Sequence, residues 1–235
     1  MAISKEKLME YFQELNPGKN VADLFKEGVR IGIYGSSFDP ITDAHIWTAA
    51  TIANRKKLDF IIFLPSIGEA RRDKKIQTQD KHRIEMLKLA IADEKEFILD
   101  SYEMNVLPEK QYTYYTMEHF KEVFPGAELF FIMGADLLVD IADGKWTMDK
   151  DLIENNKFIV MARDGIDMLK TISHSPLLRN HDDGRFQLLD KGLAMEISSS
   201  YIRAEIAYGG TAKGLLPKPC YNYIKEKGLY KEIIR

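Results

Sequence analysis

Thr42 and His45 form the first pair of residues whose types and spacing suggest chemistry. They close the segment Gly-Ser-Ser-Phe-Asp-Pro-Ile-Thr-Asp-Ala-His, residues 35–45, which follows an alternating apolar run. Threonine is a favourable N-cap, so a helix is predicted to begin at Asp43 with His45 at its third position. The imidazole would then lie beside free backbone N–H groups at the positive end of the helix dipole, a setting that binds phosphate.

A second group of hydroxyl side chains and a cation lies about 150 residues later, where residues 197–203 read Ile-Ser-Ser-Ser-Tyr-Ile-Arg. Ser199 and Ser200 are predicted to stand at a helix start, with Arg203 one turn into the helix. Backbone N–H groups, serine hydroxyls and a guanidinium could then meet on one anion. A serine-rich N-cap with a solvated arginine is the structural alternative.

Further polar residues follow a later apolar run. Gly134 leaves room for a ligand at the end of that run, and Asp136 could accept hydrogen bonds from a ribose or simply cap a helix. Trp146 follows ten residues after Asp136. Residues 112–116, Tyr-Thr-Tyr-Tyr-Thr, precede a helical pattern and could also be a cap with aromatic packing.

The elements that position these residues read as an α/β fold. Strands are predicted at residues 29–34, 60–64, 129–133 and 158–161, and helices at 44–55, 82–92 and 115–123. Strands that alternate with helices favour a parallel sheet with helices on both faces, and ligands bind beyond the carboxyl ends of such strands. Nothing marks a second domain. Residues 1–28 read as a helical extension, with a stripe at Leu8, Tyr11, Phe12 and Leu15, and residues 29–235 as the main domain.

Composition excludes several classes of protein. The 235 residues carry 33 Lys and Arg against 36 Asp and Glu, a net charge of −3, so no nucleic-acid partner is expected. Cys220 is the single cysteine, which excludes an intrachain disulfide framework and a cysteine-rich zinc site. No apolar run approaches the roughly 18 to 20 residues of a membrane span. We therefore expect a cytoplasmic protein without a membrane partner.

Residues 35–45 resemble the T/H-x-G-H signature of the nucleotidylyltransferase superfamily. They are most similar to the nicotinamide/nicotinate mononucleotide adenylyltransferases, in which Gly-Ser-Phe-(Asp/Asn)-Pro-Ile precedes that motif. Thr42 stands where a first histidine is common, and Ala44 replaces a glycine. Residues 134–136 resemble the family's Gly-Ala-Asp segment, and residues 197–203 its Ile-Ser-Ser-Thr-x-Ile-Arg motif. The resemblance implies a Rossmann-like nucleotidylyltransferase domain over residues 29–235.

The resemblance also implies a function. It predicts transfer of AMP from ATP to nicotinate or nicotinamide mononucleotide, with release of pyrophosphate and formation of the dinucleotide in NAD biosynthesis. His45 and Arg203 are the predicted catalytic residues. Residues implied to bind ATP are Gly35, Ser36, Ser37, Phe38, Thr42, His45, Gly134, Asp136, Ser199, Ser200 and Arg203. Residues implied to bind the mononucleotide are Ser37, Thr113 and Trp146, the last by stacking on the pyridine ring.

Several points stay open at the level of sequence. Mg²⁺ is expected to arrive with ATP, because no protein metal cage is recognisable. One or more of Arg71, Arg72, Lys74 and Lys75 are expected to approach the mononucleotide phosphate. The preferred mononucleotide, the oligomeric state, a homo-oligomer included, and the role of residues 1–28 are undecided.

Three other functions compete with this interpretation. They are another enzyme of the same superfamily, such as a pantetheine-phosphate or glycerol-phosphate type, a catalytically silent nucleotide sensor, and a Rossmann-type dehydrogenase. The length of the chain disfavours the first, and intact His45, Asp136 and Arg203 disfavour the second. The missing Gly-x-Gly-x-x-Gly fingerprint weakens the third.

Overall fold

A computed structural model of the chain describes residues 3–66, 78–190 and 197–231. In these ranges six parallel strands form one sheet in the order β3-β2-β1-β4-β5-β6. The strands are β1 (Arg30–Ser36), β2 (Phe60–Pro65), β3 (Phe97–Leu99), β4 (Glu128–Gly134), β5 (Lys157–Met161) and β6 (Phe186–Leu189). The expected α/β class, with a parallel sheet, is confirmed.

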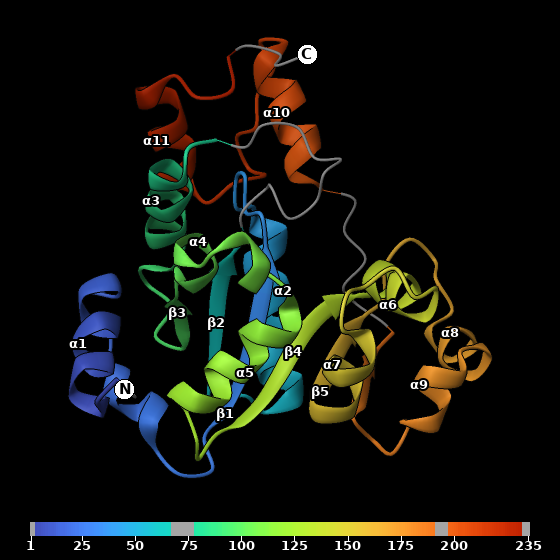
Figure 1. The fold of residues 1–235 in the computed structure, drawn as a ribbon. Coiled ribbons are helices and arrows are strands. Elements are labelled where there is room, and N and C mark those ends of the chain that lie inside the picture. The colour runs from blue at the N-terminus through green and yellow to red at the C-terminus, as the bar shows by residue number, and fades with distance from the viewer. Residues whose placement is uncertain (1–2, 67–77, 191–196, 232–235) are drawn as a thin grey trace.

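Helices follow most of the strands (Figure 1). They are α1 (Lys5–Leu15), α2 (Asp43–Lys56), α3 (Asp80–Ile91), α4 (Tyr102–Asn105), α5 (Thr113–Val123), α6 (Ala135–Ala142), α7 (Asp149–Asn155), α8 (Met168–His174), α9 (Pro176–Asn180), α10 (Ser199–Ala207) and α11 (Lys218–Lys227), with short 3-10 helices η1 (Val21–Phe25) and η3 (Pro108–Lys110).

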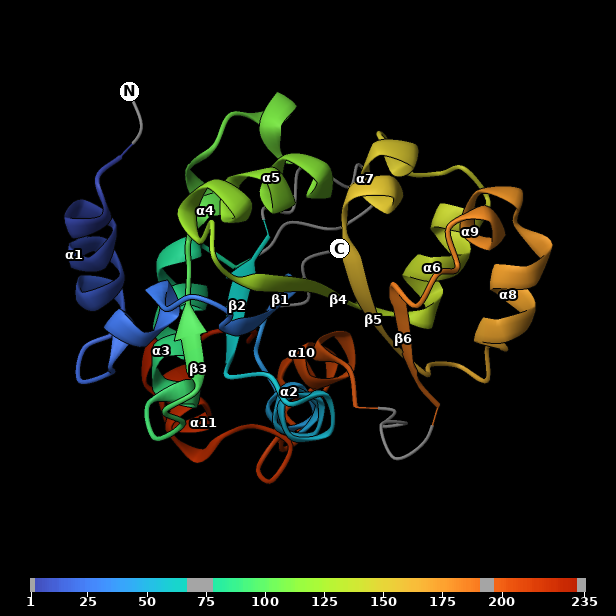
Figure 2. The ribbon, with the colours of Figure 1, turned by 90° about the horizontal axis from the view of Figure 1, so that it is seen from below.

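Helices cover both faces of the sheet, as expected. Figure 2 shows α5 and α7 on one face and α2, α3, α10 and α11 on the other. Two clusters of buried side chains match this division: one contains Phe120 of α5 and Leu152 of α7, and the other contains Ile52 of α2 and Met86 of α3. The sheet is therefore buried from both sides, which explains the uninterrupted apolar runs of its central strands.

The boundaries differ from the predicted ones where tertiary pairing decides them. The first strand was expected to end at Tyr34, but Gly35 and Ser36 pair with Leu64 and Pro65 of β2, so β1 continues to Ser36. Strands β3 and β6 were not predicted at all. They have three and four residues, too few to show a hydrophobic period.

The N-terminal extension consists of α1 and η1 and lies beside edge strand β3 (Figure 1). Its buried residues Phe12, Val21 and Leu24 join the same hydrophobic cluster as α5. The division into residues 1–28 and 29–235 remains a prediction.

Candidate active site

The residues predicted to bind ATP gather around the carboxyl ends of β1 and β4. These strands are neighbours, yet β1 leads to β2 on one side of the sheet and β4 leads to β5 on the other. Segments that leave two such strands diverge and open a crevice, the usual ligand site of a parallel α/β sheet. The turn before α2 follows β1, and α6 follows β4 directly. Both lie at this crevice.

Thr42 and His45 form a reciprocal capping box at the start of α2. The Thr42 side chain accepts a hydrogen bond from the His45 backbone N–H at 3.3 Å, and His45 Nδ1 accepts one from the Thr42 backbone N–H at 3.1 Å. Nδ1 also lies 2.7 Å from the Thr42 hydroxyl. Because a backbone N–H can only donate, Nδ1 carries no proton, and the neutral ring holds its proton on Nε2. The box thus fixes His45 as an Nε2–H donor.

The surroundings of His45 keep the ring neutral. Desolvation, with a smaller effect of the positive charge of Arg163, lowers the pKa of His45 to about 4. The ring lies 5.2 Å from Phe38 and 6.3 Å from Tyr34, measured between centroids. Phe38 has a left-handed backbone, with φ 45°, and a fully buried side chain. It can therefore offer a ligand its backbone but not its ring.

The second predicted motif contacts the first directly. Ser198 is the N-cap of α10. From the first turns of the helix, Ser199 Oγ donates to the Pro40 carbonyl at 2.8 Å, and Arg203 Nη1 donates to the Asp39 carbonyl. Arg203 Nη2 donates to Ser200 Oγ at 3.1 Å. The start of α10 is thereby attached to the turn that precedes α2, although about 160 residues separate them.

The Asp39 carboxylate stabilises the contact between α10 and the turn before α2. Its carboxylate is almost fully buried and accepts hydrogen bonds from the Tyr230 hydroxyl at 2.6 Å and the Thr78 backbone N–H at 3.1 Å. Burial and the Asp39 charge raise the pKa of Tyr230, so its hydroxyl remains a donor. The segment after α11 therefore supports the same turn whose carbonyl holds Arg203.

Gly134 and Asp136 lie at the start of α6. A Cβ atom at residue 134 would lie 2.3 Å from Asp136 Oδ1, so the glycine is required for the present position of the carboxylate. Gly35, by contrast, could carry a Cβ with only ordinary contact to Phe131. Asp136 Oδ1 is buried without a hydrogen-bond partner among the described residues, while Oδ2 lies 3.9 Å from Arg163 Nη1. A buried acceptor without a donor favours a ligand hydroxyl at this position.

The two residues expected at the pyridine ring lie on separate elements. Thr113 is the first residue of α5, after the N-cap Tyr112. Trp146 is half-buried, with its ring centroid 6.4 Å from that of Phe131 in an edge-on arrangement. Ser36 lies within β1, and Ser37 follows it. Residues 71–75, expected near the mononucleotide phosphate, fall outside the described residues.

Known proteins are similar to this sequence over most of the chain. The cytidylyltransferase-like family model matches residues 33–205. A probable nicotinate-nucleotide adenylyltransferase of Clostridium tetani (strain Massachusetts / E88) is 37% identical over 199 residues, which cover 85% of this chain and 98% of that protein. A second, from Neisseria meningitidis serogroup C, is 31% identical over 206 residues, covering 86% and 99%. The chain belongs to the nicotinate-nucleotide adenylyltransferase family.

Solved structures of this family share the fold. The Plasmodium falciparum nicotinic acid mononucleotide adenylyltransferase complexed with NaAD has a TM-score of 0.66 at 24% identity, covering 88% of this chain and 100% of that chain. A putative nicotinate-nucleotide adenylyltransferase from Vibrio parahaemolyticus has a TM-score of 0.59 at 17% identity. The predicted enzyme class is confirmed. The relatives favour none of the three competing functions.

Two arginines of this family member were missed from the sequence. Arg163 follows β5 and approaches Asp136, and its charge reaches His45. Its place at a strand end was the signal that could have found it. Arg83 of α3 is 1% exposed and donates to the Ser37 carbonyl at 2.9 Å and the Ser66 carbonyl at 2.7 Å. It shares the buried stripe of its helix with Leu87, where a charged residue is unusual.

No group of three or more His, Cys, Asp or Glu side chains within residues 3–66, 78–190 and 197–231 is arranged to hold a metal. A cavity of about 370 Å³ opens at the amino ends of β1, β4 and β5, beside Gly28 and Glu128. None of the helices in those ranges is long and apolar enough to span a bilayer.

Proposed function

We propose that the chain transfers the adenylyl group of ATP to nicotinate mononucleotide. The observation that carries this proposal is the contact of Arg203 and Ser199 with the backbone of Asp39 and Pro40. Through it, the start of α10 and the turn before α2 form one surface rich in donors for phosphate. His45 supplies an uncharged donor to the same surface.

The reaction needs no nucleophile from the protein. A phosphate oxygen of the mononucleotide attacks the α-phosphorus of ATP, a new P–O bond forms, and the bond between the α-phosphorus and the bridging oxygen breaks as pyrophosphate leaves. The protein's work is to align the two nucleotides and stabilise the charge that develops on the phosphates. To that task we assign the Nε2–H of His45, the backbone N–H of Ser199, the hydroxyl of Ser200 and the N–H groups of Arg203 that face away from Asp39.

The remaining residues are assigned to the two ends of the product. Asp136 Oδ1 accepts a hydrogen bond from a hydroxyl of the adenosine ribose, which would supply the donor that this buried oxygen lacks among the described residues. Ser37, Thr113 and Trp146 contact the mononucleotide, with the indole stacked on the pyridine ring. The names of the relatives, probable nicotinate-nucleotide adenylyltransferases, support nicotinate over nicotinamide mononucleotide.

Mg²⁺ would enter this site bound to the phosphates of ATP. The Asp39 carboxylate is already engaged with Tyr230 and Thr78, so it is not a free metal ligand. The ion would be held by the phosphates and would neutralise their charge. Location in the cytoplasm and the oligomeric state, a homo-oligomer included, stay predictions.

Substrate preference tests the proposal. With ATP and Mg²⁺, the protein should form a dinucleotide from nicotinate mononucleotide with a kcat/KM at least tenfold above that for nicotinamide mononucleotide. Phosphopantetheine and glycerol phosphate should give no nucleotidyl product, and EDTA should abolish turnover. A preference for nicotinamide mononucleotide would show that the amide, not the acid, is the substrate. Turnover with phosphopantetheine would show that the protein is a different nucleotidylyltransferase.

A further inference from the structure

The N-terminal extension makes a specific polar contact with the segment that leads to the predicted mononucleotide residues. The Tyr11 hydroxyl of α1 donates to Asp100 Oδ1 at 3.1 Å and accepts from the Ser101 backbone N–H at 3.2 Å. Asp100 and Ser101 directly follow β3, at the carboxyl edge of the sheet. Residues 1–28 lie outside the span matched by the family model. The contact is thus supplied by a part of the chain outside that match.

Asp100 depends on the donors around it. Its side chain is 1% exposed, and desolvation raises its pKa to about 6. Oδ1 also accepts from the Tyr102 backbone N–H at 2.6 Å. A carboxylate buried to this degree needs hydrogen bonds to stay in place. The Tyr11 hydroxyl therefore helps to fix both Asp100 and the first turn of α4.

From α4 the connection continues to α5. The Thr116 hydroxyl donates to Glu103 Oε1 at 2.7 Å, and Thr116 lies one turn after Thr113. The Tyr102 ring stacks on His119, with centroids 3.7 Å apart and planes 5° apart. Two contacts of different kinds thus couple α4 to the helix whose first residue is Thr113.

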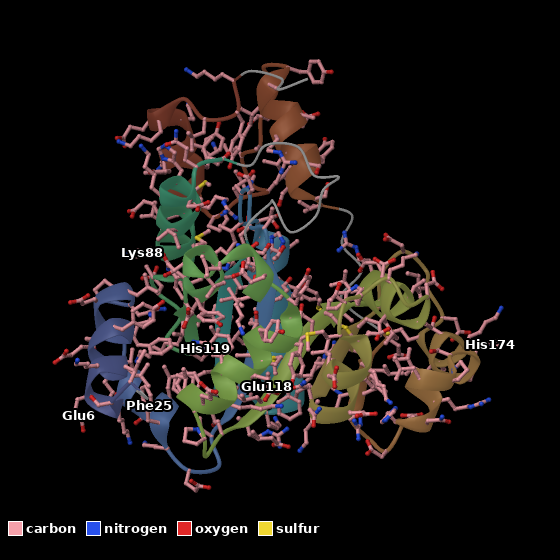
Figure 3. The ribbon with its side chains drawn as sticks, viewed as in Figure 1. Glu6, Phe25, Lys88, Glu118, His119 and His174 are labelled. Carbon is pink, nitrogen blue, oxygen red and sulfur yellow. The ribbon has the colours of Figure 1, made fainter. Side chains whose placement is uncertain are left out.

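The extension also contacts edge strand β3 and the C-terminal end of α5. The Asn16 side chain donates to the Leu99 carbonyl at 2.9 Å and accepts from the Leu99 N–H at 2.7 Å, as a neighbouring strand would. Phe25 lies 5.1 Å from Phe124, which follows α5. Figure 3 shows Phe25 beside α1 and His119 on the neighbouring α5. These contacts make the extension a fixed support for Tyr11.

We propose that the extension positions the mononucleotide side of the site, with Tyr11 as the positioning residue that acts through Asp100 and α4 on Thr113. The proposal rests on the proposed function for the identity of the substrate. It assigns a role to residues that touch neither nucleotide. ATP binds at β1, β4 and α10, elements that Tyr11 does not contact in the described residues, so the effect is specific to one substrate.

The test is the variant Tyr11→Phe, which removes one hydroxyl and keeps the ring. A lost hydrogen bond of about 0.5 to 1.5 kcal/mol corresponds to a roughly two- to tenfold change. We expect KM for nicotinate mononucleotide to rise by about this factor, while KM for ATP stays within twofold. Tyr208→Phe is the matched control, because Tyr208 is 78% exposed and stands at the end of α10. It should leave both KM values unchanged.

Hydrogen exchange provides a readout that is independent of turnover. The amides of Ser101 and Tyr102 should exchange faster in Tyr11→Phe, and those of β2 should not. Equal rises of both KM values, or unchanged KM values with unchanged exchange, would overturn the positioning role. If the unaltered protein forms no dinucleotide, the proposed function fails, and exchange alone then decides whether Tyr11 positions this segment.

Discussion

His45 is the residue on which the proposed chemistry depends most. Its Nδ1 is occupied by the Thr42 backbone N–H, and its pKa is lowered to about 4, so at neutral pH it offers one uncharged Nε2–H donor. An uncharged donor stabilises negative charge without an ionisation step in the neutral range. The pH dependence of kcat between pH 6 and 9 should therefore show no ionisation of this residue.

Replacement of this donor defines the first prediction. His45→Ala should lower kcat by about 10²- to 10³-fold, the scale measured for one lost donor to a developing negative charge. The Thr42 backbone N–H loses its acceptor in this variant, so stability should also fall by about 1 to 3 kcal/mol, and kcat is compared at a temperature where both proteins are folded. His174→Ala is the control, since His174 is exposed on α8, far from the crevice (Figure 3). Unchanged kcat in His45→Ala would remove the residue from the mechanism.

Gly134 provides a second prediction at this scale. In Gly134→Ala the new methyl group would displace the Asp136 carboxylate, which now lies 2.3 Å from its position. A side-chain carboxylate can move aside cheaply, so stability should stay within about 1 kcal/mol of the original. KM for ATP should rise roughly tenfold, as for one lost hydrogen bond of about 1.4 kcal/mol. An unaltered KM for ATP would show that Asp136 does not bind the ribose.

At the scale of elements, the sequence predicted what local patterns determine. Thr42 and Asp43 were placed correctly as cap and helix start, and the apolar runs of β2, β4 and β5 were recognised within one residue of their ends. The contact between α10 and the Asp39 carbonyl was not predictable, because it depends on how distant segments dock. Arg163 was missed although it follows β5 directly, and its contact with Asp136 of α6 again depends on how distant segments pack.

Arg83 should hold three elements of the fold together. It joins α3 to the segments that follow β1 and β2 through the Ser37 and Ser66 carbonyls. Arg83→Met would leave these carbonyls without their donor, at a cost of about 1 to 3 kcal/mol each. We expect urea unfolding to show a total loss of about 3 kcal/mol. Arg179→Met, at an exposed position of α9, should cost less than about 0.5 kcal/mol. A loss below 1 kcal/mol for Arg83→Met would contradict its bridging role.

The whole molecule should respond to acid through histidines held neutral inside it. Desolvation lowers the pKa of His119 to about 4, below its ordinary value of 6.5. Between these two values the unfolded chain binds a proton that the folded chain does not, so this residue's contribution to stability falls as the pH falls from about 6.5 to 4. Asp100 and Glu103, with pKa values raised to about 6 and 7, act in the opposite direction.

The difference in free energy of unfolding between the unaltered protein and His119→Gln isolates the contribution of this histidine. The free energy of unfolding of His119→Gln, subtracted from that of the unaltered protein, should be most favourable to histidine above pH 6.5 and should decline towards pH 4. Denaturant titrations at pH 7, 6, 5 and 4 measure this difference. A difference that does not vary with pH would mean that the folded state does not hold His119 neutral.

In the proposed reaction, ATP and nicotinate mononucleotide meet between β1, β4 and α10, and AMP passes from ATP to the mononucleotide. The most direct measurement is the amount of dinucleotide and of pyrophosphate formed together from ATP, Mg²⁺ and nicotinate mononucleotide. We expect equal molar amounts of the two products, with neither formed when the mononucleotide is left out. Tight binding of ATP without any dinucleotide would contradict it.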